Sequence, residues 1–166
     1  ATNIADYTIA TTTLTVFAGN TSTTTTLTAV NNNLFELDEA VVIDIATVTK
    51  GTKGTPSQQT VTIRDDEATP SVTISALVFG AEGNAGTTNT SVTLTLSSVS
   101  DIDTMVTLTK GGTAKDGIDY NLATSTVVIL AGDTTSSVVL SALPDNLDED
   151  DETIVITMDA LIQNGV

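Results

Sequence analysis

Apolar and polar residues alternate along most of the chain with the two-residue period of β-strands that bury one face. Residues 13–17 alternate, turn at Ala18-Gly19-Asn20 and resume through a Thr-rich run to Val30, which predicts a hairpin. Residues 126–143 repeat that hairpin around Ala131-Gly132-Asp133. Further short strands are expected at residues 40–45, 60–63, 72–74, 91–96, 105–108 and 153–158. Since no segment has a helical period, the pattern predicts an all-β sandwich.

Two related copies of one domain make up the chain. When Ala1 is aligned with Ala114 without gaps, the first 47 residues fall on residues 114–160 with 18 identities. The first copy has no counterpart of residues 70–113, and the second stops before any counterpart of residues 59–67. We therefore predict an incomplete domain at residues 1–68 and a second at 69–166 that lacks its last strand. Each should leave an open sheet edge.

Composition and charge exclude several classes of function. The chain has no Cys and no His, which removes disulfides, thiol chemistry, Zn²⁺ or Cu²⁺ sites and a histidine base. Its formal charge of −16, from 21 acidic against five basic residues, argues against binding a nucleic-acid backbone. A mean hydropathy of +0.21 is too high for a disordered acidic tail. No apolar run reaches about 18 residues, so we expect no membrane insertion.

The densest chemistry lies in residues 144–152, where six of nine residues are carboxylates and none is basic. An earlier copy of this acidic loop occupies residues 31–39. Oxygen ligands packed so closely are what Ca²⁺ requires. The alternative interpretation is a solvated acidic turn that keeps the protein soluble. The EF-hand pattern fails, because the sixth position of the later loop is not Gly.

Other acidic residues also stand at expected strand ends. Glu82 lies between glycines, Asp119 precedes Tyr120, and Asp65-Asp66-Glu67 follows the strand expected at residues 60–63. Several of these groups could therefore meet at one end of a sandwich. Paired carboxylates can hydrolyse glycosides, but such sites usually carry aromatic platforms, and this chain has only two Tyr and three Phe. We do not expect an enzyme.

Taken in order, these motifs resemble the Calx-beta domain. The resemblance rests on Gly-Thr-Ala followed by Asp-Tyr, Ala-Gly before a strand, an acidic loop ending Glu-Asp-Asp-Glu, and Thr-Val-Thr-Ile followed by Asp-Asp-Glu. It spans nearly the whole chain and implies tandem immunoglobulin-like antiparallel β-sandwiches with Ca²⁺ bound at one end. The metal ligands that it implies are Asp6, Glu36, Glu39, Asp65, Asp66 and Glu67 in the first copy and Glu82, Asp119, Asp145, Glu149 and Glu152 in the second.

The resemblance also implies a role for the protein. We expect a calcium-binding structural repeat of a secreted or cell-surface protein, acting as a Ca²⁺-stiffened stalk in adhesion. Its partners would be neighbouring repeats, copies of itself, or a cell-surface or matrix ligand. The alternative is a subunit of an extracellular filament that assembles head-to-tail by β-strand addition. A regulatory Ca²⁺ sensor would need an attached transporter or enzyme. Pro144, Asn31 and Asn32 replace acids usual in Ca²⁺-binding members, which should weaken binding.

Overall fold

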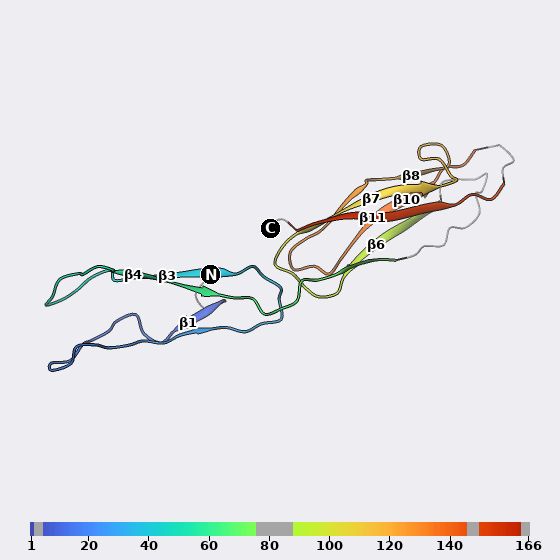
Figure 1. Ribbon diagram of the computed structural model, residues 1–166. Coiled ribbons are helices and arrows are strands. Elements are labelled where there is room, and N and C mark those ends of the chain that lie inside the picture. Colours follow the sequence, from blue (N-terminus) through green and yellow to red (C-terminus); the bar gives the residue numbers. More distant parts are fainter. Residues whose placement is uncertain (2–4, 76–87, 146–149, 164–166) are drawn as a thin grey trace. The chain divides into compact units, whose positions relative to one another are not determined.

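In the computed structural model, which describes residues 1, 5–75, 88–145 and 150–163, all regular structure is β-strand (Figure 1). This confirms the predicted all-β fold class. The described strands are β1 Tyr7–Ile9, β2 Leu27–Ala29, β3 Glu39–Asp44, β4 Gln58–Ile63, β5 Val72–Ile74, β6 Thr88–Leu96, β7 Thr104–Gly112, β8 Tyr120–Leu122, β9 Thr126–Ile129, β10 Thr135–Ala142 and β11 Ile154–Gln163.

The chain forms two compact units. Unit 1 comprises Ala1–Asn33 and Leu37–Asp66, and unit 2 comprises Leu34–Glu36 and Glu67–Val166. The short segment Leu34–Glu36 joins unit 2 because its backbone pairs there. The amide of Phe35 donates to the carbonyl of Val99 at 3.2 Å, and the amide of Asp101 donates to the carbonyl of Phe35 at 2.9 Å. The predicted boundary between residues 68 and 69 stays a prediction.

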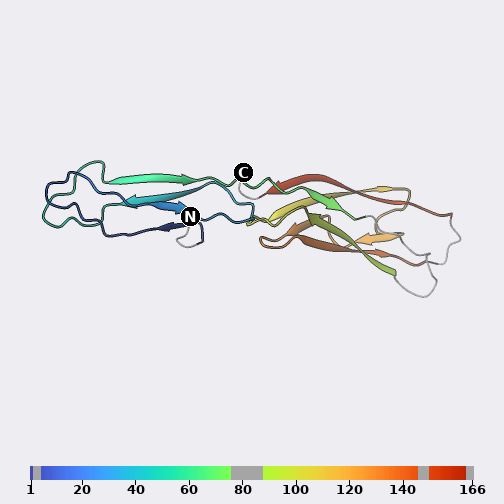
Figure 2. The same ribbon diagram turned by 90° about the horizontal axis from the view of Figure 1, so that it is seen from below.

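Unit 2 is a sandwich of two antiparallel sheets, with strand orders β5-β6-β10-β8 and β11-β7-β9 (Figure 2). Its core consists of the inward positions of alternating strands, because successive side chains of a strand point to opposite faces. Burying each Leu or Val stabilises the unit by about 1.5–3 kcal/mol. The core side chains are Val92, Leu94, Leu96, Val106, Leu108, Tyr120, Leu122, Val127, Ile129, Val138 and Leu140.

The hairpin predicted around residues 131–133 is wrong. β9 pairs with β7 in one sheet, whereas β10 pairs with β6 and β8 in the other. The connection therefore crosses from one sheet to the other through a turn at Gly132, which has a φ of +85°. Both strands carry one apolar face, so they bury it by facing each other across the core rather than by lying side by side.

Unit 1 has two separate strand pairs, β1-β2 and β3-β4, in its described residues. The first pair keeps the register of its counterpart in unit 2, since Tyr7 pairs with Ala29 as Tyr120 pairs with Ala142. The strand predicted at residues 13–17 is wrong, because this segment belongs to no strand. Its counterpart β9 is held by β7, and the first copy contains no counterpart of β7.

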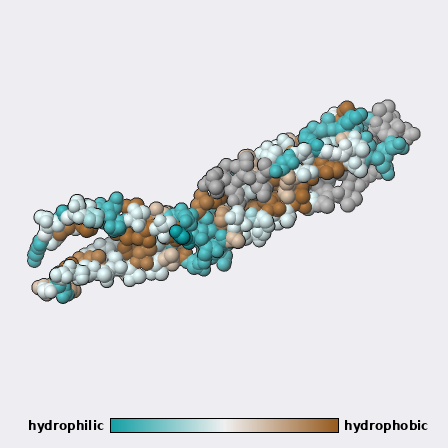
Figure 3. Space-filling model, viewed as in Figure 1, coloured by the Kyte–Doolittle hydropathy of each residue, from teal (hydrophilic) through white to brown (hydrophobic). Residues whose placement is uncertain are grey.

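Equivalent apolar positions are buried in unit 2 and exposed in unit 1. Ile129 is 0% exposed and Val127 is 4% exposed, but their counterparts Val16 and Leu14 are 51% and 46% exposed. Among the described apolar side chains of unit 1, only Val41 is buried. Figure 3 accordingly shows hydrophobic side chains, in brown, at the surface between the two strand pairs of unit 1. Unit 1 is thus an open half of a sandwich.

Candidate metal-binding sites

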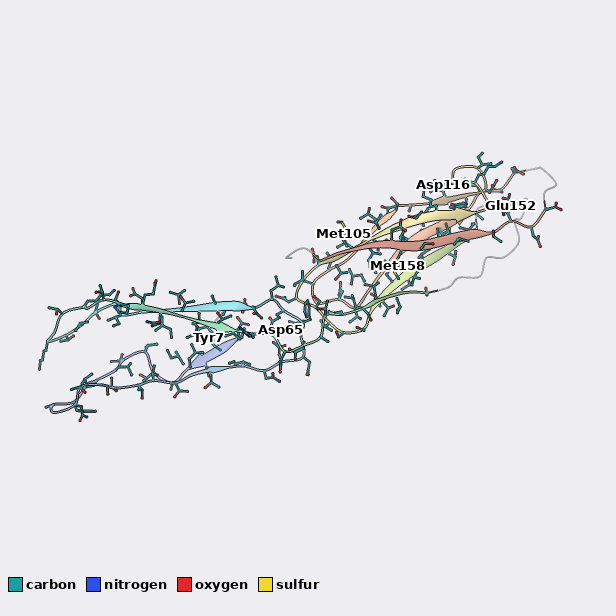
Figure 4. The ribbon with its side chains drawn as sticks, viewed as in Figure 1. Tyr7, Asp65, Met105, Asp116, Glu152 and Met158 are labelled. Atoms are coloured by element: carbon teal, nitrogen blue, oxygen red, sulfur yellow. The ribbon has the colours of Figure 1, made fainter. Side chains whose placement is uncertain are left out.

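Three of the predicted ligands in unit 2 lie beside the ends of its strands. Asp119 immediately precedes β8, Asp145 follows β10, and Glu152 precedes β11. The amide of Leu143 donates to the carbonyl of Asp119 at 2.8 Å, which joins the end of β10 to the start of β8. Figure 4 shows Glu152 at one end of this unit and Met105 at the other. Two further predicted ligands, Glu82 and Glu149, lie outside the described residues.

The carboxylate of Asp119 is fixed by the turn that precedes β8. One of its oxygens, Oδ2, accepts a hydrogen bond of 2.6 Å from the amide of Lys115. The amide of Asp119 in turn donates to the carbonyl of Lys115 at 2.9 Å, and Gly117 supports the turn with a φ of +82°. A carboxylate has about four lone-pair sites, so this bond leaves acceptor capacity for a cation.

Two further charged groups surround the tyrosine that follows Asp119. Burial of Tyr120 raises the pKa of its hydroxyl above the ordinary 10.0, and the negative charge of Asp116 raises this pKa further. The positive charge of Lys110, which forms an ion pair with Asp116, acts on the pKa in the opposite direction. The end of the sandwich that carries the acidic residues therefore favours the protonated, neutral tyrosine.

In unit 1, acidic residues gather at one end of the β3-β4 pair. Glu39 begins β3 and is paired with Ile63, the last residue of β4, so Asp65 and Asp66 follow at the same end. The amide of Asp65 donates to Oδ1 of Asp38 at 3.3 Å. The N-terminal ammonium group lies 3.3 Å from Oε1 of Glu39. Asp38 was not predicted as a ligand, and neither was its counterpart Asp151 in the later acidic loop.

The remaining predicted ligands of the first copy fall in different places. Asp6 precedes β1, where its carbonyl accepts a hydrogen bond of 2.9 Å from the amide of Val30. Glu36 and Glu67 belong to unit 2. Within the described ranges, no group of three or more acidic side chains is arranged to hold a metal ion. The predicted metal ligands therefore stay predictions.

One carboxylate oxygen in unit 1 is buried without a hydrogen-bond donor among the described residues. Oδ2 of Asp65 is buried, and within the described part of the chain it has no hydrogen-bond partner. A buried polar atom without a partner is unfavourable by about 1–3 kcal/mol, and by more when it is charged. A hard cation is a partner that such an oxygen accepts, so the residues around Asp65 fit a Ca²⁺ ligand set in chemistry.

Two antiparallel units with acidic residues at their strand ends define a tandem module of the β-sandwich class. The Calx-beta domain family matches residues 1–67 and again residues 68–165. The chain therefore belongs to the Calx-beta domain family and contains two tandem copies, which confirms the resemblance. This is a family of structural and binding domains associated with calcium rather than a family of enzymes. A search of curated proteins found no match. None of the described segments is a helix long and apolar enough to cross a membrane.

Proposed function

We propose that the chain is a calcium-binding structural repeat of a secreted or cell-surface protein, without catalytic activity of its own. Bound Ca²⁺ would neutralise the acidic strand ends and stiffen the module as part of a stalk in adhesion. Its partners would be neighbouring repeats, copies of itself, or a surface or matrix ligand. Membership of the Calx-beta family and the position of the acidic residues at strand ends support this proposal.

The buried oxygen of Asp65 is the observation that carries the proposal. In unit 1 the ion would be held by Asp65 and Asp66 with Glu39 and Asp6, and the other proposed ligands of the first copy are Glu36 and Glu67. In the second copy the proposed ligands are Glu82, Asp119, Asp145, Glu149 and Glu152. Ca²⁺ supplies positive charge to oxygens that otherwise repel one another.

Ca²⁺ titration by calorimetry, with thermal unfolding in Ca²⁺ and in chelator, tests the proposal. We expect saturable binding and a higher thermal midpoint in Ca²⁺, since a ligand at 100 times its Kd stabilises the folded state by about 2.7 kcal/mol. Asp65→Asn should weaken binding roughly tenfold, because it removes one ligand charge. In chelator this variant should be at least as stable as the parent chain, because the buried charge is gone.

Asp44→Asn is the matched control. Asp44 ends β3 and forms an ion pair with Lys53 at 3.1 Å. Its substitution therefore removes a carboxylate charge at the opposite end of β3 from Glu39. We expect this variant to bind Ca²⁺ as the parent chain does. Absence of binding heat in the parent chain, or equal affinities for Asp65→Asn and Asp44→Asn, would contradict the proposed site.

Assembly by β-strand addition is the second candidate function. The exposed apolar residues Leu14 and Val16 in unit 1 favour it, since their counterparts Val127 and Ile129 in unit 2 are buried in the core. A neighbouring molecule that supplied strands would cover them in the same way. This candidate makes the chain a subunit of an extracellular filament.

Sedimentation at increasing protein concentration tests the assembly candidate. We expect the mass to rise with concentration, and Val16→Asp to lower the association constant roughly tenfold or more, because it places a charge in the buried face. Thr15→Asp is the control, since its counterpart Val128 lies on the outer face of β9. A parent chain that stays monomeric at every concentration would exclude the candidate.

A further inference from the structure

Both basic residues of unit 2 lie in the segment of the chain that leads to Asp119. Most of the 21 acidic residues belong to unit 2, but only two of the five basic ones do, Lys110 and Lys115. Lys110 lies near the end of β7, and Lys115 lies in the turn before β8, where its amide donates to the carboxylate of Asp119. The positive charge of unit 2 is therefore concentrated near a proposed Ca²⁺ ligand instead of being spread over the unit.

The side chain of Lys110 reaches the acidic end of unit 2 from the core face of β7. Alternation places Lys110 on the same face as Leu108, which is buried, and its partner in the ladder, Ile156, packs against the core. Its Nζ forms an ion pair of 2.5 Å with Oδ2 of Asp116, and its side chain is 30% exposed. Figure 4 shows Asp116 at the same end of unit 2 as Glu152. The stem of Lys110 thus starts on the core face while its ammonium group lies at the end of the sandwich.

The turn before β8 brings this ion pair next to Asp119. The amide of Gly117 donates to the carbonyl of Tyr120 at 2.6 Å, which closes the turn that contains Asp119 and begins beside Asp116. Burial and the charge of Asp116 raise the pKa of the Tyr120 hydroxyl, and the positive charge of Lys110 lowers it. The electrostatic effect of Lys110 therefore extends to the residue that directly follows a proposed ligand.

A second set of hydrogen bonds connects the end of β7 with the start of β11. The amide of Thr113 donates to the carbonyl of Thr153 at 2.9 Å, and the amide of Thr153 donates to Oγ1 of Thr113 at 2.9 Å. Thr153 directly follows Glu152, another proposed ligand. The strand end that carries Lys110 is thus fixed beside proposed ligands from two different segments.

A fixed ammonium group among carboxylates acts in opposite directions with and without a metal ion. Without the ion, it reduces the repulsion between the carboxylates. With Ca²⁺ bound, the ammonium group and the ion carry charges of the same sign and repel each other. The ion pair with Asp116 contributes little by itself, because pairs of this exposure are weak. The main effect of Lys110 is therefore expected on the acidic end as a whole.

From these observations we infer that Lys110 is a built-in counter-ion of the second-copy metal site. Its ammonium group stabilises the acidic end of unit 2 in the absence of metal and lowers the affinity of that end for Ca²⁺. The inference rests on the proposed calcium-binding function, for which it names the residue that limits the affinity of the second copy.

Lys110→Met tests the inference, because methionine keeps an unbranched apolar stem and removes the charge. The chain has no Trp and two Tyr, so in a Tyr7→Phe background all tyrosine fluorescence comes from Tyr120, beside the second-copy site. Ca²⁺ titration followed by this fluorescence and by calorimetry should give a Kd roughly tenfold lower for Lys110→Met. Lys110→Arg keeps the charge and should bind with the Kd of the parent chain.

Lys53→Met is the matched control for loss of a paired lysine. Lys53 forms an ion pair of 3.1 Å with Asp44, and both residues belong to unit 1. This variant removes one positive charge from the chain, as Lys110→Met does, but at a position outside unit 2. We expect the Kd of the second-copy site to be unchanged.

Denaturant unfolding in chelator separates the charge of Lys110 from the packing of its stem. Lys110→Met should lower the unfolding midpoint of unit 2 more at low salt than at high salt, because salt screens the attraction that is lost. A loss that is the same at both salt concentrations would assign the effect to packing and contradict a counter-ion role.

The possible failures are distinguishable. If the parent chain binds Ca²⁺ at the second-copy site and Lys110→Met binds it with the same Kd, the inference is overturned while the calcium-binding function stands. If neither chain binds Ca²⁺ there, both are overturned for this copy. If Lys110→Met binds Ca²⁺ and the parent chain does not, the counter-ion role is supported, whereas the proposed function is excluded for this copy of the parent chain.

Discussion

At the scale of single residues, the two tyrosines show how much the surroundings of a residue decide. Tyr7 and Tyr120 follow the same Asp and begin strands with the same register. Tyr120 is fully buried because β6 and β7 complete its sandwich, whereas Tyr7 is half-buried in a unit without those strands. Burial in the closed sandwich raises the pKa of the Tyr120 hydroxyl.

We predict that Tyr120 makes the protein sensitive to alkali. A folded-state pKa above the unfolded value contributes stability that is complete below pH 10.0 and is lost as the pH rises toward the folded pKa. The loss from this group is at most about 1.4 kcal/mol per pH unit. Tyr120→Phe should flatten the fall in stability above pH 10, as measured by denaturant unfolding between pH 8 and about 12.

Tyr7→Phe is the control for the same experiment. It removes one tyrosine from the equivalent position of the first copy and leaves Tyr120 in place. We expect its stability to fall with pH as in the parent chain. Equal slopes for the parent chain and Tyr120→Phe would show that Tyr120 does not couple folding to pH.

At the scale of elements, β7 and β11 approach each other closely where β7 ends, at Gly112. Gly112 ends β7 with a φ of +107°, and a Cβ there would lie 2.0 Å from the carbonyl oxygen of Thr153. Only a residue without a side chain permits this backbone contact. The amides of Thr113 and Ala114 then both reach Thr153, which aligns the start of β11.

Gly112→Ala should therefore destabilise unit 2 well beyond the effect of its backbone conformation. A positive φ alone is unfavourable by about 1–2 kcal/mol for alanine, and the clash with Thr153 adds to it. Gly132→Ala has the matching conformation, with a φ of +85°, but no atom within 4 Å of the new Cβ. Denaturant unfolding should show the larger loss for Gly112→Ala, and similar losses would contradict a steric role for Gly112.

The sequence predicted most strands but not their partners. Alternation located β3 to β7 and β11 within a few residues, since one buried face is enough to specify period two. It failed at residues 13–17, whose alternating face depends on a strand that the first copy lacks. It also failed to place β9 and β10 in different sheets. Pairing depends on contacts between distant parts of the chain, which a local pattern does not contain.

The candidate site was predictable to a similar degree. Acidic residues were expected at strand ends, and Asp119, Asp145, Asp65 and Glu152 lie there. The sequence could not show that Glu36 is held in unit 2 through the backbone of Phe35, or that Oδ2 of Asp65 is buried. Both depend on packing around the residue rather than on the spacing of acids.

At the scale of the whole molecule, the two units differ in how far their equivalent apolar residues are buried. Unit 2 closes a core between two sheets, while unit 1 presents the same apolar positions to solvent. Large exposed apolar surfaces mark sites of interaction. The exposed apolar residues of unit 1 are therefore the surface that the sedimentation experiment with Val16→Asp probes.

The shared register of β1-β2 and β8-β10 also bears on how the chain folds. Before either unit has formed, Tyr7–Ile9 can pair with β10 in the register that Tyr120–Leu122 uses. In the same way, Tyr120–Leu122 can pair with β2. Similar tandem domains are prone to such misassembly, and synthesis from the N-terminus limits it by letting the first copy emerge alone. Val138 is buried in the core of unit 2, whereas its counterpart Thr25 is half-buried and lies outside β2. Such differences between the copies favour the pairing of each strand within its own domain.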